Sequence, residues 1–314
     1  MQFRPLVLLR ILVPLALFAG LLAVVDFGKA FDLVTDASQL PLIAALVLVQ
    51  VQIVLAAIRW RLTAVSLGQP LGLKRAVREY YGASLLNLVL PGGVSGDVVR
   101  IARNRHDQNG EGDWERSAHA VILERASGQL AFAAIAAAGL VLWAVNGESA
   151  PDEAVIGVKT IALIVVAFVV ASIVAAMLMR GRVRKAIQRF WVALRLAFLQ
   201  PRQAVYQLIL SFALVAAYLA VFALASFAVG APLDLYQVLL FVPPVLLTMI
   251  VPISVGGWGV REAAAAALWP LAGYAPSVGI AASVLYGLVS TVGALPGLFA
   301  FDFTLPRWLE RRTS

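Results

Sequence analysis

Long apolar runs alternate with short charged connections along the chain of 314 residues. About six of these runs approach the roughly 20 residues that an α-helix needs to cross a bilayer. Such runs predict an all-α polytopic integral membrane protein, because each helix satisfies its own backbone hydrogen bonds in lipid. The predicted full spans, all within a single transmembrane domain of residues 1–314, cover residues 6–25, 40–58, 119–145, 159–179, 205–229 and 277–301.

The first apolar run has an alternative interpretation. Arg4 and Arg10 lie near the start of the run, and a charged start followed by an apolar core is also found in cleaved signal peptides. The run at 6–25 is longer than the usual signal core. We therefore favour an uncleaved first span.

Two further apolar regions are interrupted by prolines and glycines. Membrane transporters often carry paired broken helices at equivalent points of two repeats, and their binding sites lie there. The two regions here share a pattern of ten residues, from Pro91 to Arg100 and from Pro252 to Arg261. Without gaps, the segments agree at Pro91/Pro252, Val94/Val255, Gly96/Gly257, Val99/Val260 and Arg100/Arg261.

The placement of charge predicts the orientation of the chain. Lysine and arginine collect in cytoplasmic loops. The acidic connections 26–39 and 146–158 are therefore predicted to lie outside, and Tyr80 and Tyr81 are predicted to anchor the chain at an interface. The parts predicted to lie in the cytoplasm are the N-terminus, 59–118, 180–204 and the C-terminal tail.

The same charges predict the course of the two interrupted regions. Residues 79–105 must begin and end on the cytoplasmic side, and residues 235–272 must begin and end outside. Both are therefore predicted to be re-entrant helical hairpins, one entering from each side. An odd number of full spans separates them, which predicts inverted-topology repeats of about 40–145 and 205–301.

Composition limits the chemistry that the chain can perform. Charged residues make up 13% of the chain, whereas a soluble domain carries roughly 25%. There is no cysteine, and His106 and His119 lack any metal-ligand spacing, so we expect neither a metal nor a cofactor. The net charge of +8 is explained by membrane orientation, and we expect no nucleic-acid partner.

The interrupted regions carry residues that suit an anionic ligand. Helix-start N–H groups attract anions, glycines allow close approach, and guanidinium groups match phosphate. The alternative is that the glycines serve packing and that Arg100 and Arg261 pair structurally with Asp97 and Glu262. The predicted substrate-binding residues are Asn87, Pro91, Gly93, Gly96, Asp97, Arg100, Glu124, Arg125, Pro252, Ser254, Gly256, Gly257, Gly259, Arg261 and Glu262.

Glu124 and Arg125 lie inside an otherwise apolar span. Each such charge costs about 3 kcal/mol on insertion scales and usually faces a cavity or a partner. Adjacent residues point in different directions on a helix, so we expect Glu124 to meet Arg100 or Arg261 instead of Arg125. Two roles stay open for Glu124: protonation that couples transport to a proton gradient, or a static buried ion pair.

Three ordered motifs occur along the chain: Asn87-Leu-Val-Leu-Pro91 with Gly96-Asp97-Val-Val-Arg100, Glu124-Arg125 with Gly128, and Pro252-x-Ser254-x-Gly256-Gly257-x-Gly259-x-Arg261-Glu262. Together they resemble the lysylphosphatidylglycerol synthase/flippase transmembrane family over nearly the whole chain. The resemblance implies a bacterial inner-membrane protein. Some members of that family translocate aminoacylated phosphatidylglycerol, and stand-alone members are associated with hopanoid and other lipid pathways. The resemblance also implies that Asp97, Arg100, Glu124, Arg125, Arg261 and Glu262 line a lipid headgroup path.

These observations favour a flippase-like lipid translocase that moves a phosphate-bearing or modified headgroup between leaflets. The soluble transferase domain of the synthase members is not found in this sequence, so we expect no enzyme activity. The alternatives are a membrane-embedded accessory or enzyme of lipid, hopanoid or cell-envelope biosynthesis, and a small-solute secondary transporter. The expected partners are membrane lipids, with a homodimer and a separate lipid-synthesis enzyme left open.

Overall fold

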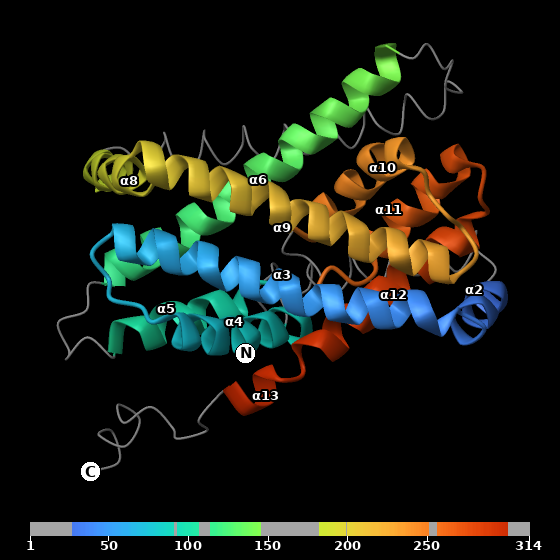
Figure 1. Ribbon diagram of the computed structural model, residues 1–314, viewed down its shortest axis with the longest axis horizontal. Coiled ribbons are helices and arrows are strands. Elements are labelled where there is room, and N and C mark those ends of the chain that lie inside the picture. Colours follow the sequence, from blue (N-terminus) through green and yellow to red (C-terminus); the bar gives the residue numbers. More distant parts are fainter. Residues whose placement is uncertain are drawn as a thin grey trace, which may run out of the picture.

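The computed structural model describes residues 27–90, 93–106, 114–145, 182–198, 200–250 and 256–300 (Figure 1). All regular elements in these ranges are helices, as the apolar runs predict. The elements are α2 (Phe27–Thr35), α3 (Gln39–Ser66), α4 (Leu73–Val89), α5 (Ser95–His106), α6 (Trp114–Val145), α8 (Arg182–Phe198), α9 (Pro201–Ala228), α10 (Leu235–Leu247), η1 (Thr248–Ile250), α11 (Val260–Leu268), η2 (Trp269–Ala272), α12 (Pro276–Ala294) and α13 (Gly297–Ala300).

Four helices of the described chain are long and apolar enough to cross a membrane: α3, α6, α9 and α12 with its continuation into α13. Helix α3 has 28 residues, which at about 1.5 Å per residue exceeds the thickness of a bilayer core. These helices coincide with the predicted spans at 40–58, 119–145, 205–229 and 277–301. The predicted spans at 6–25 and 159–179 lie outside the described residues.

Helices α3 and α9 pack side by side in opposite directions. At one end of the pair, the Ser38 N–H donates to the carbonyl oxygen of Ala228 at 2.9 Å. At the other end, Gln207 Nε2 donates to Thr63 Oγ1 at 2.8 Å. The start of α3 therefore lies beside the end of α9. Since α4 follows the end of α3 and α10 follows the end of α9, the two interrupted regions begin at opposite ends of the bundle (Figure 1).

Helices α4 and α5 form the first hairpin. Gly93, in the break between them, has φ +63°, a conformation that glycine adopts without a Cβ penalty. The Asn87 side chain accepts a hydrogen bond from the Gly96 N–H at 2.8 Å and so closes the start of α5 onto α4. A Cβ at Gly96 would overlap the Ala83 carbonyl oxygen, so glycine is what allows α5 to lie against α4.

Helices α10 and α11 form the second interrupted region. Asp234 caps α10 by accepting from the Gln237 N–H at 2.7 Å, and the Gln237 side chain accepts from the Asp234 N–H in return. The break ends with three glycines of positive φ, which turn the chain into α11: Gly256, Gly257 and Gly259.

The two breaks meet inside the bundle. A Cβ at Gly256 would lie 2.6 Å from the carbonyl oxygen of Leu88, near the end of α4. The tips of the two interrupted regions are therefore in backbone contact, although the regions begin at opposite ends of the molecule. This is the geometry expected of two hairpins that enter from opposite sides.

Two stretches that were predicted to be connections contain helices. Helix α2 lies within the acidic connection 26–39, and α8 lies within the basic connection 180–204. Helix α8 forms because Ala193 and Ala197 recur at helical spacing and are buried against the bundle. The last predicted span, 277–301, corresponds to α12 and α13 together, with a break near Pro296 between Ala294 and Gly297.

We expect Gly96→Ala to destabilise the protein by about 1–3 kcal/mol, because the new methyl group forces α5 away from the α4 backbone. The measurement is thermal unfolding in detergent. Val98→Ala is the matched control on the same helix, because Val98 is exposed, and its effect should stay within about 0.5 kcal/mol. Equal losses for the two variants would contradict the tight contact between α4 and α5.

Candidate functional site

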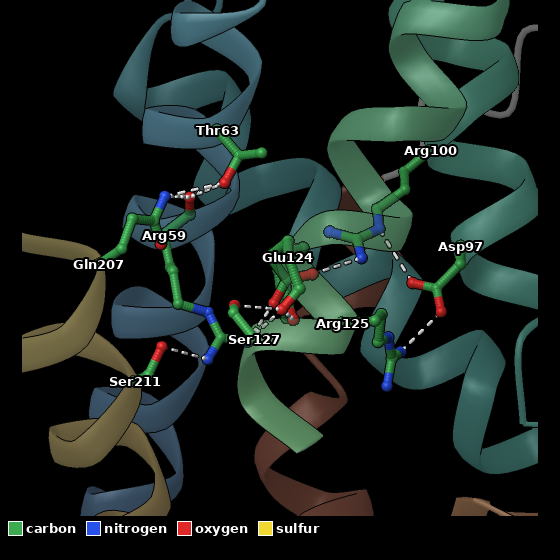
Figure 2. Close-up of polar contacts among 10 residues, drawn as sticks. Arg59, Thr63, Asp97, Arg100, Glu124, Arg125, Ser127, Gln207 and Ser211 are labelled. Atoms are coloured by element: carbon green, nitrogen blue, oxygen red, sulfur yellow. Dashed lines mark hydrogen bonds and ion pairs between the residues drawn. The ribbon is translucent and has the colours of Figure 1, made fainter. Parts of the chain in front are cut away.

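A buried carboxylate, that of Glu124, lies where α3, α5 and α6 meet (Figure 2). Its Oε1 accepts from Arg59 Nη2 at 2.5 Å, and its Oε2 accepts from Arg100 Nη2 at 2.8 Å. The same Arg59 nitrogen also reaches the Glu124 carbonyl oxygen at 3.1 Å. The predicted contact with Arg100 is thus confirmed. Arg261 does not contact Glu124, and the place of a second arginine is taken by Arg59.

Asp97, in the first turn of α5, adds a second carboxylate to the ion pairs around Glu124. Its Oδ1 accepts from Arg100 Nε at 2.9 Å, and its Oδ2 pairs with Arg125 Nη2 at 2.7 Å (Figure 2). Arg125 therefore turns away from Glu124, as expected for adjacent residues of a helix. We call the five residues Arg59, Asp97, Arg100, Glu124 and Arg125 the charge centre.

The charge centre holds three guanidinium groups and two carboxylates, which leaves one positive charge in excess when all are ionised. Each arginine also keeps one buried nitrogen without a protein partner within the described structure: Arg59 Nε, Arg100 Nη1 and Arg125 Nε. Buried guanidinium N–H groups without acceptors are unfavourable, so the site has both unused donors and unbalanced charge.

Arg100 lies between two aromatic rings. Its guanidinium carbon is 5.0 Å from the centre of the Trp60 ring and 4.8 Å from that of Tyr80. Cation–π contacts of this kind contribute about 2 kcal/mol or more when water is excluded. The Tyr80 hydroxyl also donates to Glu124 Oε1 at 3.3 Å.

The sequence-based interpretation of Tyr80 as an interfacial anchor was therefore wrong. Tyr80 is buried beside the charge centre and is not an interfacial anchor. Tyr81 is half-buried, and its hydroxyl donates to Gln50 Oε1 of α3 at 2.6 Å. From sequence alone, a tyrosine near basic residues suggests a position at the membrane interface. In the structure, however, α4 directs the Tyr80 ring toward Arg100 and the Tyr81 hydroxyl toward α3.

Arg261 has closely similar surroundings in the second half of the chain. Its Nε donates to Ser283 Oγ at 2.8 Å, its Nη2 donates to Glu262 Oε1 at 2.7 Å, and its Nη1 has no protein partner in the described residues. Its guanidinium carbon lies 5.0 Å from the Trp258 ring and 5.1 Å from the Tyr286 ring. Both motif arginines are thus buried between a tryptophan and a tyrosine.

The helix starts are less open to anions than the sequence suggested. The Gly96 N–H is taken by Asn87, and the Gly259 N–H donates to Glu262 Oε2 at 2.6 Å. Those two N–H groups are therefore not available to a ligand. A Cβ at Gly257 would meet the Met249 side chain, which gives this glycine a packing role. The remaining predicted residues, Pro91, Pro252 and Ser254, lie outside the described residues.

Sequence reasoning missed Arg59, because it was taken as the charged end of the second span. The apolar pattern continues past it to Ala64 and Val65, which is the signal that could have placed it inside. Gly128 is linked to the same residue: a Cβ there would lie 2.9 Å from Arg59 Nη2, so glycine leaves room for the guanidinium. The aromatic and hydroxyl partners Trp60, Trp258, Ser283 and Tyr286 were also missed.

The described part of the chain contains no group of three or more metal-binding side chains that could hold a metal ion. What the site offers instead is arginine donors and positive charge, held by carboxylates and aromatic rings. An anion with several oxygen atoms fits this set of donors.

The fold and the site define a class: an all-helical, multi-pass membrane protein with a cluster of buried charged residues beside its first interrupted region. The chain belongs to the family described as lysylphosphatidylglycerol synthase TM region, whose model matches residues 11–297. This family membership relates the protein to membrane lipids. Searches of curated proteins and of solved structures found no match to the chain.

We expect Glu124→Gln to destabilise the protein by about 3–5 kcal/mol, because it leaves Arg59 and Arg100 buried without their carboxylate. Thermal unfolding in detergent measures the loss. The control is Arg189→Gln, which breaks the exposed pair with Glu115 and should lose at most about 1 kcal/mol. A further Arg59→Gln change should lose less in the Glu124→Gln background than in the wild type. Additive losses would mean that the two side chains are not coupled.

Proposed function

We propose that the protein is a flippase-like lipid translocase that moves a phosphate-bearing headgroup between the leaflets of the bacterial inner membrane. The observation that carries this proposal is the excess positive charge of the charge centre, together with its unpartnered guanidinium nitrogens. A phosphate supplies both the missing charge and the missing acceptors. Arginine forks suit phosphate in particular, because two N–H groups bind two oxygens at once.

Access from the lipid supports a lipid substrate over a small solute. The most apolar part of α6 is only 11% buried, whereas that of α12 is 61% buried. The Arg125 side chain is 42% exposed, and Ile122 and Leu130 on the same helix are exposed as well. A headgroup can thus approach Arg125 from the side while its acyl chains stay against the apolar surface of α6.

Competition at Arg125 gives a physical route for entry. Asp97 is the carboxylate that Arg125 pairs with, and that pair links α5 to α6. An arriving phosphate competes with Asp97 for the same guanidinium group. Glu124 meanwhile keeps Arg59 and Arg100 in place. Binding of the headgroup would therefore loosen one contact between the first hairpin and α6 without dismantling the rest of the site.

The two halves are proposed to act as inverted-topology repeats, about 40–145 and 205–301. Three observations support this: the antiparallel packing of α3 and α9, the opposite starting points of the two hairpins, and the similar aromatic surroundings of Arg100 and Arg261. With the basic connections in the cytoplasm, both termini are cytoplasmic, the first hairpin enters from inside and the second from outside.

In liposomes with labelled phosphatidylglycerol, we expect Arg125→Gln to slow translocation about 10- to 150-fold. The estimate corresponds to the loss of one charge-assisted hydrogen bond of about 1.5–3 kcal/mol. Lys74→Gln on the exposed start of α4 removes the same charge and should leave the rate unchanged. Absence of transport for every anionic, modified or polyprenyl lipid tested would refute the translocase. Formation of a new lipid product in detergent would favour the enzyme alternative.

The proton-coupling role of Glu124 stays a separate prediction. If its protonation drives transport, the rate should depend on a pH gradient in the wild type, and Glu124→Gln should abolish that dependence. The assay compares rates per folded protein with and without the gradient, since the variant is also destabilised. Transport by Glu124→Gln with an unchanged pH dependence would assign Glu124 the static role, as a carboxylate that positions Arg59 and Arg100.

A further inference from the structure

A groove of about 830 Å³ lies apart from the charge centre, where the end of α3, the start of α6 and α8 come together. In Figure 1, α8 is seen almost end-on while α3 and α9 run across the view, so α8 lies across the ends of these long helices. Helix α8 belongs to the basic stretch that the positive-inside rule places in the cytoplasm. The groove therefore opens at the level of the inner-leaflet headgroups.

The charged wall of the groove favours an anion. Arg116 and Arg189 both line it, together with His119. Among the described residues that line the groove, Glu115 has the one carboxylate, and it pairs with Arg189 Nη1 at 2.5 Å. No acidic residue occurs between 180 and 204, so the α8 side of the groove adds no further negative charge. The wall is thus net positive even with histidine neutral.

The other wall is apolar and exposed. Val192 and Leu196 of α8 line the groove and are 57% and 43% exposed. Beside them, Trp191 is half exposed, and the Arg195 guanidinium lies 5.5 Å from its ring centre. Tryptophan and arginine around an apolar strip are typical of a helix that lies in the headgroup region of a membrane. A soluble anion would contact the charges but would leave this strip uncovered.

We propose that this groove binds an anionic phospholipid of the cytoplasmic leaflet, with its phosphate at Arg116 and Arg189 and an acyl chain along Val192 and Leu196. The bound lipid supplements contacts between α8 and α6 such as the Arg189–Glu115 pair and the edge-on contact of His119 with Phe190. It is a retained lipid, distinct from the lipid that passes the charge centre. The proposal therefore does not depend on transport.

The test compares detergent-solubilised wild type with the double variant Arg116→Gln/Arg189→Gln. Lipid retention is measured by native mass spectrometry with added phosphatidylglycerol, and thermal stability is measured in parallel. Basic residues near an anionic surface contribute about 1 kcal/mol each, so we expect about 30-fold weaker retention at the groove and a smaller melting-temperature rise on addition of phosphatidylglycerol. Lys74→Gln/Arg78→Gln on α4 removes two exposed charges elsewhere and should retain the lipid as the wild type does.

Three further measurements complete the test. Phosphatidylcholine should give no comparable rise in melting temperature, and soluble glycerol phosphate should not replace the lipid. In the Arg125→Gln background, which weakens only the charge centre, the double change should weaken retention by the same factor as in the wild type, because the groove is separate from the charge centre. Undiminished retention in the double variant would overturn the proposal, as would equal stabilisation by phosphatidylcholine or by glycerol phosphate. Each of these outcomes leaves the translocase proposal to its own assay.

Discussion

The carboxylate of Glu124 is the constraint on which the first half of the structure depends. A charge buried at membrane depth is tolerated only with partners, and Glu124 obtains them from α3 and α5 at 2.5 and 2.8 Å. Helix α5 is short and polar, so lipid offers it little stabilisation. Its attachment to Glu124 through Arg100 therefore accounts for its place inside the bundle. Gly128 serves the same centre, since its missing side chain is the space that the Arg59 guanidinium occupies.

Both halves bury an arginine, but the net charge around that arginine differs between them. In both, a buried arginine lies between a tryptophan and a tyrosine and keeps one nitrogen unpartnered within the described residues. In the second half, Glu262 neutralises Arg261, and α12 supplies the uncharged Ser283 hydroxyl and Tyr286 ring. In the first half, a further arginine leaves an excess of one positive charge. An anion is therefore attracted more strongly to the first half than to the second.

The sequence predicted the long helices well, because twenty apolar residues in succession have few alternatives in a membrane protein. It also predicted the contact of Glu124 with Arg100, because a charge inside an apolar span needs a partner. It failed at Arg59, where a charge looked like the end of a span although the helix runs on to Ser66. It also failed at Tyr80. The contact of this ring with Arg100 depends on tertiary packing, which the spacing of residues along the sequence does not indicate. Short amphipathic helices such as α8 were missed because their apolar faces are only partly buried.

The geometry of Asp97 links stability to release. A site that moves a headgroup must hold it, yet it must also let it go, and an uncompensated cluster of three arginines would bind phosphate too tightly for turnover. Asp97 bridges Arg100 and Arg125 at 2.9 and 2.7 Å and thereby gives both guanidinium groups an internal acceptor. In the proposed translocation, this carboxylate would lower the affinity for phosphate and would fasten α5 to α6 once the headgroup has left. Release of the headgroup and re-formation of the Asp97–Arg125 pair would then be one event, the exchange of one acceptor for another.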